Sequence, residues 1–402
     1  MREMIGRLMD ELAQMGRDTA GGYTRLAFGK VDCAIVAHLA SRMEQAGLVV
    51  RYDAFGNVFA RTRADEQPAI LLGSHTDSVP CGGNYDGIVG VVCAIAVACK
   101  AKRKKLSYPI EVVIFRAEES SRFGVANLGS KAMTGRLPSD ASSRYRDGDD
   151  RTLGEVMTAC GLVCENAVYR QAAVAFFEMH IEQGRVLESA TYPLGIVTAI
   201  AAPHRYRLTV AGRADHSGAT PMSLRSDALA GASEMILAAE AVGQAYASQD
   251  IVATVGHIEA VPNVMNVIAG KVVLSLDVRG IDKATVKQVA EEIVHRAGLI
   301  ADRRGLVLSV DTLSEETPVQ MDSRLIDTLS QAADELGERS MRLVSGAGHD
   351  ASYMTHIVPT AMLFVPSRAG ISHNPEEYTA LDDIVRGAEV LYRAVEKLSA
   401  KE

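Results

Sequence analysis

Short, largely apolar runs that alternate with a helical segment constrain the fold of this chain more than any other feature. Residues 69–72 and 110–116 have the length and composition of buried strands. Residues 88–100, between them, have the apolar pattern of a helix. This strand–helix–strand alternation predicts an α/β sheet with helices on both faces. In such sheets functional residues gather at the carboxyl ends of the strands, and both runs end in polar residues.

The α/β alternation of buried strands and helices ends near residue 204 and returns after residue 317. The stretch between these points predicts elements in the order β-α-β-β-α-β, which is typical of a small ferredoxin-like module. A length of 402 residues also exceeds what one hydrophobic core normally serves. We therefore predict one α/β domain with a mixed sheet, residues 1–204 and 317–402, interrupted by an inserted α+β domain, residues 205–316.

The charge and the apolar stretches exclude two classes of partner. A net charge of −8 argues against nucleic acid. No run approaches the roughly 18 apolar residues that a membrane span needs. Between Met1 and Leu12, acidic residues interrupt every apolar stretch, so this segment has the pattern of an amphipathic helix and not of a signal peptide. We expect a cytoplasmic protein without membrane contact.

The first apolar run leads into side chains with metal-binding chemistry. His75 follows it, and Asp77 has the spacing of a carboxylate that fixes the tautomer of a metal-bound imidazole. Asp86 lies in a glycine-rich turn, and glycines allow the close backbone approach that a buried metal site needs. Taken singly, His75 is better explained as a hydrogen-bonded loop residue, and Asp86 as a helix cap. A cap alone, however, explains neither the glycines nor the upstream histidine.

Two adjacent carboxylates, Glu118 and Glu119, follow the second apolar run. Such a pair is costly at the end of a buried strand unless metal ions or protons neutralise it. Successive side chains of an extended chain point in opposite directions, so one glutamate could bind metal while the other serves as a general base. An acidic surface loop is the equally good alternative for this pair in isolation.

Two more histidines complete a candidate ligand set. His180 follows the apolar run 172–177, and His373 lies beyond the predicted strand 360–365. Three imidazoles and two carboxylates suit a pair of zinc-like ions, each with two private ligands if one carboxylate bridges. The five candidate ligands are His75, Asp86, Glu119, His180 and His373.

These motifs resemble the M20 metallopeptidase family. The resemblance is carried by residues 73–79, 85–87, 118–119 and 372–375. Further motifs narrow it to the hydantoinase/carbamoylase branch, which holds N-carbamoyl-L-amino acid hydrolases, β-ureidopropionase-like enzymes and allantoate amidohydrolases. Those further motifs are residues 121–124, 129–135, 180–184, 215–221 and 346–351.

The resemblance implies how the ligands divide between two divalent metal ions. His75, Asp86 and His180 would hold one ion, and Asp86, Glu119 and His373 the other. Zn²⁺ is the expected metal, and Mn²⁺, Co²⁺ or Ni²⁺ could replace it at such ligands. Glu118 would be the general base, and Asp77 would support the site.

The same resemblance implies substrate contacts from both predicted domains. His216 would reach the active site of a partner subunit in a homodimer and stabilise the oxyanion, while Asn266 and Arg279 would bind the substrate carboxylate. Gln183 and His349 are further candidate contacts. From the residues alone, a surface charge at a strand end is the better explanation of Arg279, and a turn residue that of Asn266. For His349, a structural loop histidine is an equally good explanation.

The function that follows is hydrolysis of the ureido C–N bond of an N-carbamoyl-L-amino acid. The inserted domain would then act as a lid and dimerisation domain on a catalytic, metal-binding domain. Allantoate or a related ureido acid is the alternative substrate. A dipeptidase or N-acyl amino acid hydrolase fits the branch-specific motifs less well. A metal-free binding protein would be expected to have lost a ligand or Glu118, and this sequence retains them all.

Overall fold

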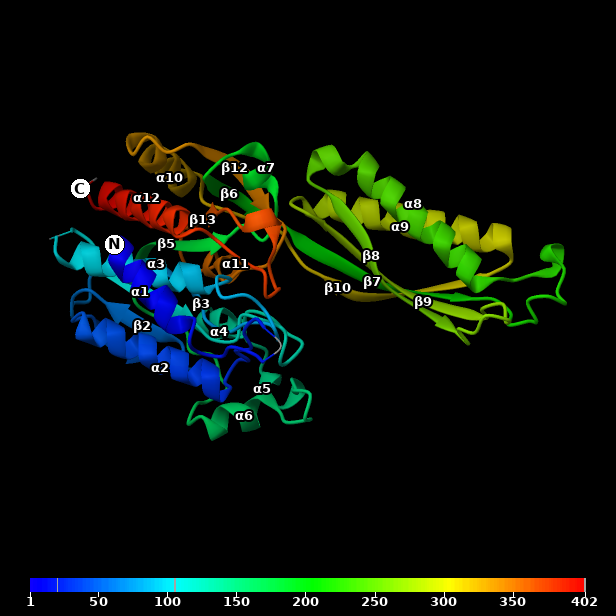
Figure 1. Ribbon diagram of the computed structural model, residues 1–402, viewed down its shortest axis with the longest axis horizontal. Coiled ribbons are helices and arrows are strands. Elements are labelled where there is room, and N and C mark those ends of the chain that lie inside the picture. The colour runs from blue at the N-terminus through cyan, green and yellow to red at the C-terminus, as the bar shows by residue number, and fades with distance from the viewer. Residues whose placement is uncertain (20, 105, 401–402) are drawn as a thin grey trace. The chain divides into compact units, whose positions relative to one another are not determined.

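The computed structural model describes residues 1–19, 21–104 and 106–400. The chain forms two compact units (Figure 1). The first comprises Met1–Thr198, Met321–Leu343 and His349–Glu402, and the second comprises Ala199–Gln320 and Val344–Gly348. The second unit thus begins earlier than the predicted insertion and includes a short later segment that sequence patterns did not indicate.

The large mixed sheet has the order β1-β2-β4-β3-β5-β13-β6-β11, with β12 also paired to β6, and all its strands except β11 lie wholly or mostly in the first unit. Its four central strands, β4, β3, β5 and β13, run parallel to one another, and the flanking strands are antiparallel. The mixed α/β architecture is therefore as expected. The strands are β1 (Val49–Tyr52), β2 (Val58–Arg61), β3 (Ala69–His75), β4 (Ile110–Phe115), β5 (Ala173–Ile181), β6 (Leu194–Ile200), β11 (Val319–Gln320), β12 (Ser340–Ser345) and β13 (Thr360–Val365).

Helices cover both faces of this sheet, as successive side chains of β5 show. Met179 lies against Gly387 of α12 (Leu381–Ser399), whereas the neighbouring Glu178 accepts a hydrogen bond from Ala351 of α11 (Ala351–Met354). Helix α3 (Ile88–Lys102) is apolar all round, as a helix packed between the sheet and other helices must be. The remaining helices of this unit are α1 (Arg2–Leu12), α2 (Lys30–Gln45), α4 (Leu128–Met133), α5 (Ala141–Arg144), α6 (Leu153–Ala159), α7 (Val186–Ala190) and α10 (Ser323–Glu335).

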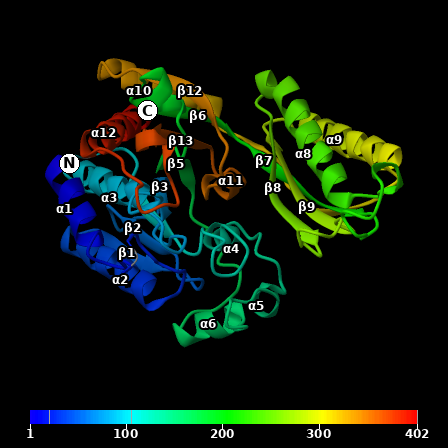
Figure 2. The same cartoon turned by 45° about the vertical axis from the view of Figure 1, so that its right-hand side comes forward.

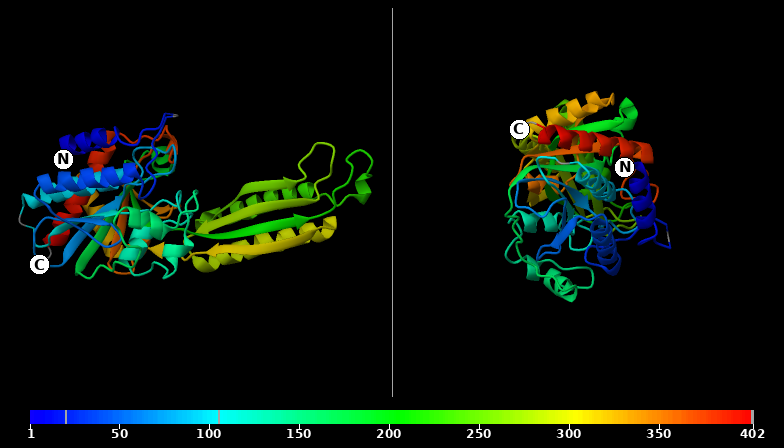
Figure 3. Two further views of the ribbon diagram at one scale, coloured as in Figure 1. Left: turned by 90° about the horizontal axis from the view of Figure 1, so that it is seen from below. Right: turned by 90° about the vertical axis from the view of Figure 1, so that its left-hand side faces the viewer.

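The first and last helices of the described chain contact each other in this first unit. Arg2 of α1 pairs with Asp382 of α12, and Figure 3 shows these helices in blue and red. Among the described residues, no helix combines the length and the apolar character needed to cross a membrane.

The second unit has a four-stranded antiparallel sheet in the order β10-β7-β9-β8. Alternate side chains of these strands form one core with two helices, and Figure 2 shows both helices on the same face of the sheet. The observed chain order is the predicted β-α-β-β-α-β. The elements are β7 (Ala202–Ala211), α8 (Ala228–Ala245), β8 (Val252–Val261), β9 (Lys271–Gly280), α9 (Lys283–Arg304) and β10 (Val307–Glu315).

The structure extends the predicted elements in two ways. β5 continues beyond the apolar run through polar positions that the sheet buries, so His180, which follows that run, lies within the strand. Strands β6, β11 and β12 were not predicted from the sequence. β11 has two residues, and β12 is only partly buried, so neither carries a strong apolar signal.

Candidate metal centre

Four neighbouring strands bring the candidate ligands to one edge of the large sheet. His75 is the last residue of β3, and His180 is near the end of β5. Glu119 follows β4, and His373 follows β13. Because β4, β3, β5 and β13 are parallel and adjacent, their carboxyl ends meet at the same edge. The gathering of functional residues expected at strand ends is therefore present in the structure.

Asp86 lies at the centre of this cluster. Its Oδ1 is 3.4 Å from His75 Nε2 and 3.2 Å from His180 Nε2. Its Oδ2 is 3.4 Å from His373 Nε2, which in turn is 3.2 Å from Glu119 Oε1. The two carboxylate oxygens thus face two different ligand groups, each with its donor atoms within 4.8 Å of one another. This is the arrangement that a bridging carboxylate requires.

The donor set fits a pair of small divalent cations. Tetrahedral zinc with bonds near 2.0–2.1 Å places its ligand atoms about 3.4 Å apart, and the separations around Asp86 are 3.2–3.4 Å. Hydrogen bonds also set the imidazole tautomers. His75 Nδ1 lies 3.1 Å from the carbonyl oxygen of Asp77, and His180 Nδ1 lies 3.0 Å from that of Ile181. Each Nδ1–H donates, which makes Nε2 the nitrogen that carries the lone pair for metal. In this structure the His180 Nε2 accepts the backbone N–H of Gly87 at 3.1 Å.

The electrostatics of the cluster favour cations. Burial opposes ionisation of Asp86, but the charges and hydrogen bonds of His180, His373 and His75 hold its pKa well below the ordinary value. Hydrogen bonds to Asp86 and Glu119 raise the pKa of His373 to about 10. The carboxylates therefore create a negative potential at the positions that metal ions would occupy.

Close packing at Gly87 shows why a glycine is needed beside Asp86. The residue has φ of 64°, and a Cβ there would lie 2.5 Å from His75 Cε1. Any larger residue would push the imidazole away from Asp86.

Glu118 and Glu119 diverge as expected for adjacent extended residues. Glu119 faces His373, whereas Glu118 Oε2 lies 3.8 Å from His75 Nε2. Burial raises the pKa of Glu118 well above its ordinary value, and the charges of Glu119 and Asp350 raise it further against the attraction of His75. A raised pKa makes a buried carboxyl group a better proton acceptor than an ordinary carboxylate.

Asp77 plays a different part from the one predicted. Its backbone carbonyl, and not its carboxylate, takes the Nδ1–H of His75, since the carboxylate oxygen Oδ1 is 3.7 Å away. The carboxylate instead accepts the backbone N–H groups of Glu118 at 3.2 Å and Glu119 at 3.0 Å. Asp77 therefore anchors the acidic pair more than it orients the imidazole.

Glu377 is a site residue that sequence reasoning missed. Its Oε1 accepts from the backbone N–H of Tyr85 at 2.8 Å and of Asp86 at 3.0 Å. Its Oε2 accepts from the Ser372 hydroxyl at 3.0 Å. The side chain thus ties the Asp86 turn to the loop that carries His373, although the two are far apart in sequence. A lone acid beyond the recognised motif gives no spacing signal for this role.

Two candidate substrate contacts of the first unit lie at the cluster. Gln183 Nε2 donates to Asp86 Oδ2 at 2.6 Å. His349 is buried, and its ring centroid is 4.6 Å from that of His180. Burial and the neighbouring charge of His180 hold the pKa of His349 well below its ordinary value. His349 packs on a ligand histidine, and its contact with substrate stays a prediction.

The candidate substrate residues of the second unit are exposed or half-buried. His216 Nδ1 accepts the backbone N–H groups of Gly218 and Ala219 at 3.1 and 3.2 Å, so Nε2–H is left as an outward donor. Asn266 is beside it, since its carbonyl accepts from Ser217 N–H. Arg279 is held by Asp277 through Nε and Nη2, at 2.8 and 3.1 Å.

These residues divide between the two ends of β9. Arg279 is at one end of the strand, opposite Pro203. The His216 and Asn266 loops meet beyond the other end, where Lys271 pairs with Ala211. Residues 271 and 279 are about 26 Å apart at about 3.3 Å per residue. Within one chain, Arg279 and Asn266 therefore cannot hold the same small carboxylate, and the prediction that both bind it requires two chains.

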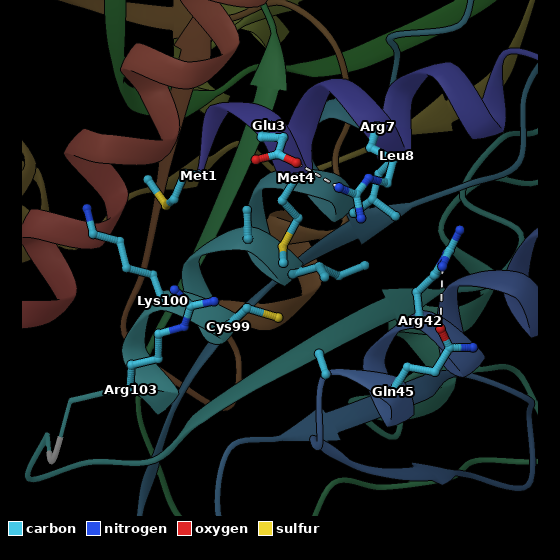
Figure 4. A pocket seen from close by; sticks show the side chains of 13 residues that line it. Met1, Glu3, Met4, Arg7, Leu8, Arg42, Gln45, Cys99, Lys100 and Arg103 are labelled. Atoms are coloured by element: carbon cyan, nitrogen blue, oxygen red, sulfur yellow. Dashed lines mark hydrogen bonds and ion pairs between the residues drawn. The ribbon is translucent and has the colours of Figure 1, made fainter.

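A separate groove of about 480 Å³ lies between α1, α2 and α3 (Figure 4). Leu8, Ile95 and Cys99 line it together with the charged side chains of Arg7 and Arg103. None of the candidate ligands lines this groove, so the metal centre is distinguished by its chemistry and not by the size of a cavity.

Known proteins resemble this chain over nearly its whole length. The family model for Peptidase family M20/M25/M40 matches residues 71–397. The N-carbamoyl-L-amino acid amidohydrolase of Geobacillus stearothermophilus is 39% identical over 408 residues, covering 100% of this chain and 99% of that protein. The allantoate amidohydrolase of Escherichia coli is 36% identical over 400 residues, covering 97% and 96%. A crystal structure of a hydantoinase/carbamoylase family amidase from Burkholderia multivorans has a TM-score of 0.93 and 34% identity, covering 100% and 98%.

The fold, the donor set and these similarities define a metal-dependent hydrolase that acts on C–N bonds other than peptide bonds. The chain belongs to the Peptidase family M20/M25/M40, in its hydantoinase/carbamoylase branch of amidohydrolases. The family resemblance drawn from the motifs is confirmed. The metal identity and the individual residue roles stay predictions.

Proposed function

We propose that this protein is an N-carbamoyl-L-amino acid hydrolase that cleaves the ureido C–N bond of its substrate. The observation that carries the proposal is the arrangement around Asp86, where two ligand groups share one carboxylate and Glu118 lies alongside. The branch-specific motifs and the printed names of the relatives support a ureido acid as substrate.

Two divalent ions, with Zn²⁺ expected and Mn²⁺, Co²⁺ or Ni²⁺ as alternatives, would act as Lewis acids that polarise the ureido carbonyl and acidify water. His75, Asp86 and His180 would hold one, and Asp86, Glu119 and His373 the other.

Glu118 would act as the proton carrier of the reaction. It takes a proton from the attacking water and returns it to the leaving nitrogen, and its raised pKa suits both steps. For an N-carbamoyl amino acid, the products are the amino acid, ammonia and carbon dioxide.

The substrate-binding residues support a homodimer. Arg279 and Asn266 lie at opposite ends of β9, so a substrate that contacts both must lie between two chains. Asp277 binds the Nε and Nη2 groups of Arg279, and Nη1 donates to the Gly346 carbonyl at 2.8 Å, so the Nη1/Nη2 edge is the part of the planar guanidinium that would face the substrate carboxylate. The outward Nε2–H of His216 from the second chain would stabilise the developing oxyanion. The second unit would thereby serve as the lid and dimerisation domain.

Allantoate is the alternative substrate, supported by relatives of similar identity that are named allantoate amidohydrolases. Purified protein, supplied in turn with Zn²⁺, Mn²⁺, Co²⁺ and Ni²⁺, should be assayed in parallel on N-carbamoyl-L-amino acids, allantoate and dipeptides. We expect the highest kcat/KM on an N-carbamoyl-L-amino acid. A higher value on allantoate would replace the proposed substrate, and hydrolysis of dipeptides alone would overturn the proposal.

The Glu118→Gln variant tests the base assignment separately. Gln keeps the size of the side chain but cannot take up a proton, so kcat should fall about 100-fold or more while the bound metal is retained. Full activity in this variant would refute the role of Glu118.

A further inference from the structure

Glu118 can act as a base only if its flexible carboxylate is held in one orientation. We propose that Asn127 is the positioning residue that holds it, and that Asp350 and Ser130 hold the Asn127 amide in turn. This inference rests on the proposed function, in which Glu118 is the general base.

Asn127 donates hydrogen bonds to both the backbone and the side chain of Glu118. Its backbone N–H donates to the Glu118 carbonyl oxygen at 2.7 Å. Its side-chain Nδ2 donates to Glu118 Oε1 at 2.8 Å. With Oε1 occupied, Oε2 is the oxygen left facing His75 and the ligand cluster, 3.8 Å from His75 Nε2. The contact therefore selects which carboxylate oxygen is available to a water molecule.

The backbone of Asn127 explains why this residue type is needed. Asn127 has φ of 59° and ψ of 35°, in the left-handed region that asparagine tolerates better than most residues. It is buried, with 7% of its surface exposed. Glycine would keep the backbone but lose the amide, and aspartate would place an anion against Glu118. Asparagine supplies both the conformation and the donor.

Asp350 and Ser130 support the amide from the far side. Asp350 is fully buried, and its Oδ1 accepts from the Ser130 hydroxyl and, at 3.4 Å, from Asn127 Nδ2. The two hydrogens of Nδ2 thus point to two carboxylates. Rotating the amide by 180° would turn its oxygen toward both of them, which is repulsive. This gives Ser130 and Asp350 a role, although both lie in branch-specific motifs to which the sequence assigned none.

The loss of this donor should affect catalysis more than binding. Without it, Glu118 retains burial and the neighbouring charges of Glu119 and Asp350 but no neutral donor on Oε1. The carboxylate is then free to rotate away from the water position. Small misplacements of a catalytic group can reduce rates on the order of 100-fold.

The test is the Asn127→Gly variant, which keeps the left-handed backbone and removes only the amide. We expect kcat to fall about 10- to 100-fold, with KM within about threefold of wild type. Bound metal per chain, measured by elemental analysis, should be unchanged. Asp250→Gly is the matched control, because Asp250 is also left-handed but exposed, and its kcat should be that of wild type.

A double-mutant cycle with Glu118→Gln separates positioning from a general structural effect. If Asn127 acts through Glu118, Asn127→Gly should not lower the residual rate of Glu118→Gln any further. Additive losses would overturn the proposal, as would wild-type kcat in Asn127→Gly. Should Asn127→Gly fail to fold, Asn127→Asp and Ser130→Ala serve instead, and wild-type kcat in both would overturn it. Full activity in Glu118→Gln would instead refute the base role of Glu118 in the proposed function, which is a distinguishable result.

Discussion

The first unit buries four of its five candidate ligands, with His373 the exposed one, whereas the second unit leaves its candidate substrate residues exposed or half-buried. His75 and His180 are each 1% exposed, and Asp86 is 7% exposed. His216 and Asn266 of the second unit are exposed, at a loop junction beyond the end of a strand. A metal site needs ligands held within a few tenths of an ångström, so it is built where four strand ends and their supporting loops meet. Residues that meet a substrate and a second chain must remain accessible until both arrive.

The largest expected effect comes from removing the shared ligand of the buried centre. Asp86→Ala should abolish binding of both metal ions, because Asp86 belongs to both ligand groups. Turnover should fall by more than about 1,000-fold, since the ions contribute several kcal/mol to the barrier. Elemental analysis and activity assays check this. The exposed Asp149→Ala is the control, and two retained metals in Asp86→Ala would contradict the bridging role.

Mixing two inactive variants tests whether the exposed residues serve a site made by two chains. His216→Ala and Arg279→Ala should each be nearly inactive alone. After dissociation and random reassociation of an equal mixture, about a quarter of wild-type activity should return, because half the dimers are mixed and each of these has one intact site. No recovery, with mixed dimers verified by mass spectrometry, would mean that both residues act within one chain.

Removing the support of the buried centre should have a smaller effect than removing a ligand. Glu377→Gln keeps the size of the side chain but replaces one acceptor oxygen with a donor, which disrupts its bonds to Tyr85, Asp86 and Ser372. Metal affinity should fall about 10- to 100-fold, as for other residues that orient ligands. Titration with a metal-competing chelator measures this. Glu376→Gln, which alters an exposed neighbour, should leave the affinity unchanged.

The smallest effect on the metal centre is expected from weakening the second unit. Leu276 is 1% exposed in the core of that unit, and Leu276→Ala should cost about 2–5 kcal/mol of its unfolding free energy. Metal content, read by elemental analysis at a temperature where the protein is folded, should match wild type. Loss of metal in the folded variant would show that the two units do not function independently in this respect.

Much of the fold could be read from local patterns. The apolar runs of β3, β4 and β13 and the six-element order of the second unit all appear in the sequence because burial in a sheet demands unbroken or alternating apolar residues. β11 and β12 did not emerge, since a strand of two residues or a half-buried strand has little apolar pattern of its own. β6, which has seven residues and is almost wholly buried, was missed as well.

The candidate site divides in the same way. The five ligands could be named from the sequence because the ability of histidine and carboxylate side chains to bind metal is a property of the residue type. Glu377 and Asn127 could not, because their importance lies in a hydrogen bond to a residue that the sequence does not place beside them. Asp77 was named with the wrong contact for the same reason.

By itself, the sequence determined which side chains can bind metal, transfer a proton or grip a carboxylate, since these are properties of single residues and their immediate neighbours. Only the tertiary structure decided that Asp86 directs its two oxygens to different ligand groups and that β9 separates Arg279 from Asn266. Such facts depend on which distant segments come into contact. The packing of the sheets determines those contacts, and no local stretch of the chain does.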